Sequence, residues 1–257
     1  MAPEEPAVLT ERRDDVLVIT INRPEARNAV NVAVAQGIST ALDELDESEE
    51  LRAGVLTGAG RSFCAGMDLK AFTQGERPWA GDRGFAGIVQ RPPRTPLIAA
   101  LEGFAVAGGF EMALACDLIV AASNTRVGIP EVKRGLVAAG GALLRLPRRI
   151  PYHVAMELAL TGELIDVQRA AELGLVNRIV DPGGALDAAL ELAAAVAANG
   201  PLAVDASKRV IVESAGWSEA EVWERQGELA EPVFASEDAG EGATAFAEKR
   251  APEWKGR

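Results

Sequence analysis

Two glutamates and a pair of glycines are the first residues of this chain to consider for a role in catalysis. Gly108 and Gly109 open the segment GGFEMALAC, whose apolar pattern predicts a helix, and Glu111 follows Gly108 by three residues. Free N–H groups at a helix start, together with the positive end of the macrodipole, stabilise negative charge on a bound oxygen. Glu131 follows Pro130 in VGIPEVKRG, where its carboxyl group could take up or release a proton. Taken singly, these residues have ordinary explanations: a helix-start turn, a carboxylate that complements the helix dipole, and a solvated loop charge.

Few side chains are available for other kinds of catalysis. The chain has two cysteines, Cys64 and Cys116, and one histidine, His153. Zinc needs about four ligands, usually Cys and His in close spacing, so we predict no metal site. A Ser/His/Asp triad would need His153, which lies in the helical pattern YHVAMELAL with no G-x-S-x-G segment elsewhere. We therefore interpret His153 as a helix-surface or packing residue and both cysteines as small buried packing residues.

The glycines of TGAGRSFCAGMDLK raise a second hypothesis, a dinucleotide-binding turn. Gly58 and Gly60 follow a predicted strand, but Phe63 stands where the third glycine of G-x-G-x-x-G is required. No G-x-x-x-x-G-K-[ST] phosphate loop occurs in the chain. Support for a dinucleotide cofactor is therefore weak, and a plain glycine turn after a strand is the competing explanation.

The composition is that of an ordinary globular protein with an acidic surface. The 257 residues are 48% apolar, enough for a sizeable core, and carry a formal charge of −12. This charge argues against a general nucleic-acid binder, although a local basic pocket for a small anion stays open. The start MAPEEPAVLTERRDD has the pattern of neither a secretory signal nor a transit peptide, and acidic residues interrupt the apolar stretches. We expect a cytoplasmic protein with no nucleic-acid or membrane partner.

Short apolar strands alternate with helices in the first part of the chain, which is typical of an α/β core with a covered sheet. A helix is predicted from Asn31 onward, because apolar residues recur at helical spacing after it. Segment 74–96 has four prolines and four glycines and is predicted to be a mobile loop with a short helix at most. The predicted strands are VLVITI (16–21), AGVLTGAG (53–60), LIAAL (97–101), DLIVAA (117–122) and LVNRIV (175–180).

The remainder of the chain is predicted to be helical. Pro201 opens one helix, Ser218 and Glu221 form a capping-box pattern before the next, and Ser236 caps the last. We therefore divide the chain into a core with the active site, residues 1–195, and a C-terminal helical region, residues 196–257.

Several of these segments, in this order, resemble the enoyl-CoA hydratase/isomerase family, the crotonases. The signature segments are FCAGMDL and GFAVAGGFEMALACD, and the likeness extends from VLVITINRPEARNAV through GLVNRIV to AFAEKRAPEWKG, nearly the whole chain. The resemblance implies an α/β fold, a crotonase-like spiral of ββα repeats with a C-terminal helical trimerisation region. It also implies a homotrimer, or a hexamer of two trimers, that acts on an acyl-CoA thioester with no cofactor besides the coenzyme A of the substrate.

The resemblance implies roles for individual residues. The N–H groups of Met67 and Gly108 would bind the thioester oxygen as the acyl group becomes enolate-like, and losing one such donor costs about 3 to 4 kcal/mol of barrier. Glu111 would activate water for attack at C3 and Glu131 would protonate C2, the two carboxyl groups titrating as a coupled pair. Retention of both glutamates favours hydration, because family members that only shift a double bond usually keep one acid/base position.

Contacts with coenzyme A follow from the same resemblance. The adenine is expected against the backbone around Ala65, with Arg27 near the phosphates, and Phe246 and Lys249 are expected to reach the coenzyme A of the adjacent subunit. A core aromatic and a solvated charge are the competing explanations for the last two residues. The remaining expected contacts are Gly66, Asp68, Leu69, Gly109 and Ala139. An alternative explanation for Asp68 is that it only braces its loop.

These expectations point to an enoyl-CoA hydratase that converts a trans-2-enoyl-CoA to a 3-hydroxyacyl-CoA, a reaction of fatty acid β-oxidation. Three alternatives stay open: an isomerase, a specialised dehydratase of the carnitinyl-CoA type, and a non-catalytic acyl-CoA-binding homologue. Typical hydratases have proline and glycine where Ala138 and Ala139 stand, and the methyl group of Ala139 could narrow the acyl range. Acyl length is expected to be set by a loop around Trp79 and Phe85.

Overall fold

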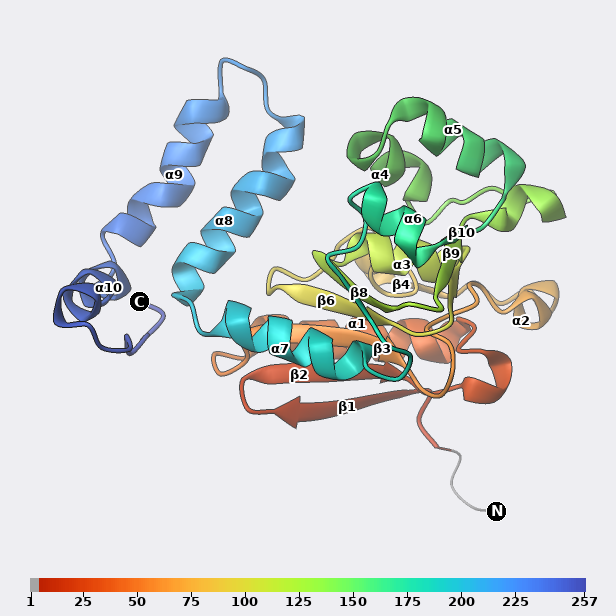
Figure 1. Cartoon of the computed structure of the whole chain (residues 1–257), viewed down its shortest axis with the longest axis horizontal. Coiled ribbons are helices and arrows are strands. Elements are labelled where there is room, and N and C mark those ends of the chain that lie inside the picture. Colours follow the sequence, from red (N-terminus) through yellow and green to blue (C-terminus); the bar gives the residue numbers. More distant parts are fainter. Residues whose placement is uncertain (1–4) are drawn as a thin grey trace.

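The centre of the protein is a six-stranded sheet. The structure is a computed structural model and describes residues 5–257. The order is β1-β2-β3-β6-β8-β11, with β1 antiparallel to β2 and all other neighbours parallel (Figure 1). All five predicted apolar strands are present, and β1 adds a polar edge strand. The bounds are β1 (Val8–Arg13), β2 (Val16–Ile21), β3 (Ala53–Gly58), β6 (Leu97–Leu101), β8 (Leu118–Ala122) and β11 (Arg178–Val180).

Both faces of this sheet are covered, which explains why its inner strands are apolar along their whole length. Helix α7 (Ala185–Ala197) lies across one face, where Ala189 and Ala193 belong to the same apolar cluster as Ile98 of β6 (Figure 1). Their small side chains let the helix come close to the strands. The residues of β6 that alternate with Ile98 join the larger cluster on the other face, together with α1 (Val32–Glu47).

Helix α1 begins and packs as its sequence predicts. The side chain of Asn31 accepts a hydrogen bond from the N–H of Val34 at 3.0 Å, a cap that contributes about 1 kcal/mol. Ile38, Leu42 and Leu45 lie on one face of the helix and are buried. This packing fixes α1 beside the sheet edge from which the site loops emerge.

Two small sheets accompany the main one, in the orders β10-β9-β7 and β4-β5. Strand β7 leads directly into α3, and the N–H of Ala107 between them donates to the carbonyl of Gly128 on β9 at 2.9 Å. This bond anchors the start of α3 to the small sheet. The strands are β4 (Trp79–Ala80), β5 (Gly84–Phe85), β7 (Phe104–Val106), β9 (Arg126–Gly128) and β10 (Ile165–Asp166). The remaining core helices are α2 (Leu69–Thr73), α3 (Gly108–Ala115), α4 (Ala142–Arg149), α5 (Tyr152–Thr161), α6 (Val167–Glu172) and the short 3-10 turns η1 (Pro24–Ala26), η2 (Gly81–Arg83) and η3 (Pro130–Arg134).

Segment 74–96 is more buried than its sequence indicates, so the prediction of a mobile loop is wrong on this point. It contains the β4-β5 pair, and much of its second half belongs to the main core. Arg83 has no exposed surface, and its guanidinium pairs with Asp43 at 2.7 Å and with Asp46 at 3.4 Å, both on α1. Arginine is almost never fully buried unless paired, and the partners lie about 40 residues away, so no local pattern revealed this.

The C-terminal helices α8 (Pro201–Glu213), α9 (Val222–Phe234) and α10 (Glu237–Glu248), with the turn η4 (Ser214–Gly216), project away from the sheet (Figure 1). Ser236 caps α10 as predicted, by accepting from the N–H of Ala239, whereas Glu221 itself is the N-cap of α9 and accepts from the N–H of Ser218. Neither α8 nor α9 contains a buried residue. The division after residue 195 and the role in trimerisation stay predictions.

No single helix within residues 5–257 has both the length and the apolar content to cross a membrane. Helix α7 and the following Pro201–Gly216 meet these two criteria only as a pair, and the pair is bent by 107°. The cytoplasmic location stays a prediction.

Candidate active site

Two backbone turns meet at the centre of the site. Gly66 has φ +91°, and a Cβ atom there would lie 2.8 Å from the Cβ of Ala107 and 3.1 Å from the nitrogen of Gly108. Only glycine therefore allows the FCAGM turn to approach the start of α3 so closely. The predicted donors Met67 and Gly108 are brought together, and within residues 5–257 neither N–H is bonded to another group. Two neighbouring unused donors can bind one developing negative charge.

Glycines at the start of α3 make room for its neighbours. A Cβ atom on Gly108 would lie 2.5 Å from the ring of Phe85, and one on Gly109 would lie 2.3 Å from the carbonyl oxygen of Cys64. Ala107, just before them, has φ +53°, an uncommon conformation for a residue other than glycine. The strand-to-helix turn is thus held in a shape that leaves the first N–H groups of α3 free of other bonds.

Glu111 lies on the first turn of α3, with 3% of its surface exposed. Its carboxylate accepts from the N–H of Ala142 at 3.1 Å. Burial raises the pKa of Glu111, while the backbone N–H groups of Ala142 and Gly140 and the nearby charge of Arg145 act in the opposite direction. A buried carboxylate held by backbone donors is well placed to act as a base.

Glu131 lies in η3 and is partly buried, and its Oε2 atom has no hydrogen-bond partner among the described residues. Burial, with a smaller contribution from the charge of Glu111, raises its pKa to about 7. An unpartnered carboxyl oxygen costs free energy in the folded protein unless a ligand or water binds it. Glu131 is therefore able to carry a proton at neutral pH, and the two glutamates are close enough to influence each other's titration.

Both glutamates and both unused donors line one cavity of about 230 Å³. Trp79 and Phe85, the aromatic residues of the segment expected to set acyl length, pack edge to face in its wall with ring centroids 5.5 Å apart. The predicted site residues in the lining are Ala65, Met67, Leu69, Gly108, Glu111, Glu131 and Ala139. Lining residues that sequence reasoning missed are Phe72, Val106, Ala107, Pro130, Arg134, Leu136, Val137 and Gly140.

The other predicted site residues lie behind or away from this cavity. Asp68 caps α2 and pairs with Arg23 at 3.0 Å, so in the folded chain it braces its loop. Arg27 is exposed, and its carbonyl accepts from the N–H of Ala65, which places it beside the cavity mouth. Phe246 and Lys249 lie in and directly after α10, at the opposite end of the molecule from α2, so within one chain they do not reach the cavity (Figure 1).

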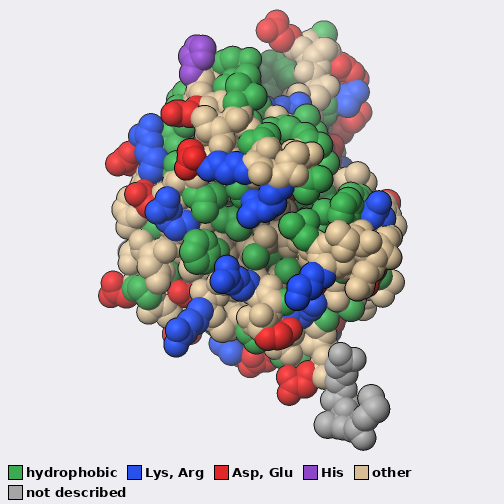
Figure 2. Space-filling view, turned by 90° about the vertical axis from the view of Figure 1, so that its right-hand side faces the viewer, with side chains coloured by type: hydrophobic (Ala, Val, Ile, Leu, Met, Phe, Trp, Pro, Cys, Tyr) green, Lys and Arg blue, Asp and Glu red, His purple; other side chains and the backbone are tan. Residues whose placement is uncertain are grey.

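The face on which α2 lies carries many cationic side chains. Figure 2 shows Lys and Arg side chains across the middle of this face, interspersed with apolar ones. The whole chain has a formal charge of −12, so the positive charge on this face contrasts with the acidic character of the protein as a whole. Such a face suits an anionic ligand with an apolar part.

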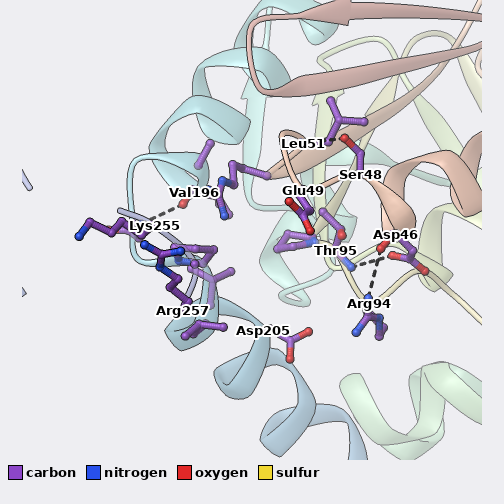
Figure 3. Close-up of a pocket in the computed structure, with 18 residues that line it drawn as sticks. Asp46, Ser48, Glu49, Leu51, Arg94, Thr95, Val196, Asp205, Lys255 and Arg257 are labelled. Atoms are coloured by element: carbon purple, nitrogen blue, oxygen red, sulfur yellow. Dashed lines mark hydrogen bonds between the residues drawn. The ribbon is translucent and has the colours of Figure 1, made fainter. Parts of the chain in front are cut away.

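A larger cavity of about 500 Å³ lies elsewhere, between the C-terminal end of α1, the α7–α8 junction and the C-terminal tail. Figure 3 shows acidic Asp46, Glu49 and Asp205 around it, together with basic Arg94 and Arg257. It shares no residue with the smaller cavity and contains neither active-site glutamate. Volume alone therefore does not identify the site, and only the smaller cavity is lined by the two predicted catalytic glutamates.

The side chains that were set aside as non-catalytic occupy positions consistent with that prediction. Cys64 and Cys116 are free and buried, and burial raises the pKa of Cys64 to about 12. His153 is exposed on α5.

Comparison with known proteins agrees with this fold and site. The sequence profile of the enoyl-CoA hydratase/isomerase family matches residues 11–257, and the chain belongs to that family. It is 44% identical to enoyl-CoA hydratase EchA19 of Mycobacterium tuberculosis, covering 98% of this chain and 97% of the relative. It is 42% identical to carnitinyl-CoA dehydratase of Proteus mirabilis, covering 95% and 97%. The crystal structure of enoyl-CoA hydratase EchA1 from Mycobacterium marinum superposes with a TM-score of 0.97 at 59% identity, covering 98% and 100%.

These likenesses confirm the predicted family, the crotonase α/β fold class and the prediction of an enzyme. The relatives are named for two different activities, enoyl-CoA hydratase and carnitinyl-CoA dehydratase. Membership of the family therefore does not identify the specific substrate. The roles of individual residues in the cavity stay predictions.

Proposed function

We propose that this protein is an enoyl-CoA hydratase that adds water across the 2,3 double bond of a trans-2-enoyl-CoA. The observation that carries the proposal is the cavity that combines buried Glu111 and partly buried Glu131 with two unused backbone donors. Addition of water to an enoyl thioester needs a base for the water, an acid for C2 and a site for negative charge on the thioester oxygen. The reaction involves no net oxidation or reduction, so no cofactor besides the coenzyme A of the substrate is proposed.

The two glutamates differ in ways that support separate roles. Glu111 accepts a hydrogen bond from the N–H of Ala142, which favours its ionised form, so we assign it as the base that activates water for C3. Glu131 has an unpartnered oxygen and a pKa raised to about 7, so we assign it as the acid that protonates C2. The N–H groups of Met67 and Gly108 are assigned to the thioester oxygen.

Binding of coenzyme A is proposed along the cationic face that carries α2. Ala65 lines the cavity, and its backbone N–H donates a hydrogen bond to the carbonyl of Arg27. This arrangement suits an adenine beside Ala65 and phosphates beside Arg27. Phe246 is 87% exposed on α10, which supports a contact with a neighbouring subunit in a trimer or hexamer.

The test is loss of the conjugated enoyl absorbance of crotonyl-CoA when the purified protein is added. Glu111→Gln and Glu131→Gln should each lower kcat by at least about 100-fold, because each removes one positioned proton-transfer group. The matched control is Glu163→Gln, which changes an exposed glutamate paired with Lys133 on the surface. Unchanged rates in both active-site variants would refute the proposed mechanism.

A second candidate is a dehydratase of the carnitinyl-CoA type, which the 42% identity to the Proteus mirabilis protein favours. Ala139 lines the cavity, so a departure from the usual hydratase sequence lies where the acyl group would bind. A panel of 2-enoyl, 3-enoyl and carnitinyl CoA esters, with products identified by mass and hydroxyl position, separates hydratase, isomerase and specialised dehydratase. Tight binding of the esters without turnover would instead indicate a non-catalytic homologue.

A further inference from the structure

Arg145 of α4 is a partly buried cation that does not line the cavity. It lies behind the loop 140–142, which separates it from Glu111. One nitrogen of its guanidinium, Nη2, donates to the carbonyl of Val89 at 2.6 Å, and Nη1 donates to the carbonyl of Gly140 at 3.3 Å. Within residues 5–257 no carboxylate lies within ion-pair distance of it. Burial and the like charge of Arg149 lower its pKa, so the position is electrostatically costly.

The loop 140–142 lies between the side chains of Glu111 and Arg145 and is packed too tightly for side chains on its two glycines. A Cβ atom on Gly140 would lie 2.5 Å from Oε2 of Glu111, and a Cβ atom on Gly141 would lie 2.2 Å from Nη1 of Arg145. Gly140 therefore packs against Glu111, and its carbonyl accepts from Arg145. Two residues further on, the N–H of Ala142 donates to the carboxylate of Glu111.

We propose that Arg145 is a positioning residue for Glu111: it fixes the loop 140–142, in which the N–H of Ala142 holds the carboxylate, and it supplies a partly buried positive charge behind Glu111. The inference rests on the proposed hydratase function, because it explains which of the two glutamates is the base. Arg145 itself does not touch the substrate cavity, so it acts through the loop and through its field.

The charged groups around the two glutamates support this assignment. Glu111 faces Glu131 across the cavity and Arg145 behind the loop, and the charge of Arg145 lowers the pKa of Glu111 against the effect of burial. Glu131 has Arg134 as its nearby cation, but that side chain is exposed and better screened by water. Arg145 in turn faces Arg149 and the buried thiol of Cys116. Glu111 thus has the stronger support for its ionised form.

The decisive experiment compares the pH profiles of kcat/KM for wild type, Arg145→Gln and Arg145→Lys with crotonyl-CoA. A base must be ionised, so activity falls as pH drops through the pKa of Glu111. Loss of the nearby positive charge should move this acid limb to higher pH in Arg145→Gln, and by much less in Arg145→Lys, which keeps a charge. A residue with a merely structural role would lower the rate equally at every pH, and that result would overturn the proposal.

Arg149→Gln is the matched control, because Arg149 lies one turn further along α4 and donates to the carbonyl of Leu114. The charge of Arg149 does not contribute to the pKa of either glutamate, so the acid limb of Arg149→Gln should stay where it is in the wild type. An equal shift in Arg149→Gln would show that the effect is not specific to Arg145.

A direct measurement of the protonation of the Glu111 carboxyl group distinguishes failure of this inference from failure of the proposed function. In a Glu131→Gln background, infrared difference spectroscopy can follow the protonation of Glu111 without turnover. An upward shift of that titration in Arg145→Gln supports the inference even if crotonyl-CoA is not a substrate, and an unchanged titration overturns it. If Arg145→Gln does not fold, Arg145→Met is the second neutral replacement, and an unchanged titration of Glu111 in that variant overturns the inference.

Discussion

Substitution of Gly140 by alanine is the most direct steric test of how Glu111 is held. The new Cβ atom would lie 2.5 Å from Oε2 and 2.8 Å from Cδ of Glu111, where an ordinary contact is about 3.5 Å. The carboxylate must therefore move by about 1 Å, which puts its bond to the N–H of Ala142 at risk. A displacement of this size at a catalytic group can cost about 100-fold in rate, while overpacking costs about 1 to 3 kcal/mol of stability.

The assay measures kcat/KM with crotonyl-CoA together with thermal unfolding. Gly227→Ala on α9 is the control, because nothing lies within 4 Å of a Cβ atom there. It should leave the rate unchanged and raise stability by about 0.5 to 1 kcal/mol, since alanine is the better helix former. A folded Gly140→Ala protein with kcat/KM within about threefold of the wild type would refute the proposed geometry of Glu111.

Two further predictions concern stability. The folded-state pKa of Glu131, about 7, lies above the ordinary value of 4.5, so its neutral form contributes stability that is lost as pH rises through about 7. Glu131→Gln should therefore raise Tm relative to the wild type at about pH 8 more than at about pH 5, and calorimetry showing the same difference at both pH values would contradict this sign. Arg83→Met should cost about 3 to 5 kcal/mol in urea unfolding, because it leaves Asp46, with 11% of its side chain exposed, without its buried partner. Arg94→Met, an exposed change in the same segment, should stay within about 0.5 kcal/mol, and equal losses in both variants would show that burial of Arg83 is unimportant.

The sequence predicted those parts of the fold whose signal is local. Strand runs such as LIAAL are apolar throughout because both faces are covered, and Asn31 and Ser236 are caps whose function depends on three or four residues. Strand β1 escaped notice because most of its side chains are exposed at a sheet edge and it has no apolar run. The strands of the small sheets have two or three residues, too few to establish a period.

In the candidate site, too, some residues could be predicted from the sequence and others could not. Glu111, Glu131, Met67 and Gly108 stood out only through the joint order of several segments, and the structure places all four around one cavity. Gly140 and Arg145 gave no signal, because their contacts join α3, α4 and the end of segment 74–96, which are distant in sequence. Residues that act through others are found only once tertiary contacts are known.

The buried thiol of Cys64 has a consequence for the lifetime of a thioester in this protein. Its neighbour Ala65 lines the cavity, and a free thiolate so close to an acyl-CoA would invite acyl transfer to sulfur, leaving a dead acylated enzyme. Burial raises the pKa of Cys64 to about 12, so its thiol stays protonated at neutral pH. Its sulfur meanwhile accepts from the N–H of Gly66 at 3.3 Å, which keeps it turned toward the turn it supports. A cysteine can thus stand beside the proposed thioester pocket without offering an acyl-CoA a competing nucleophile.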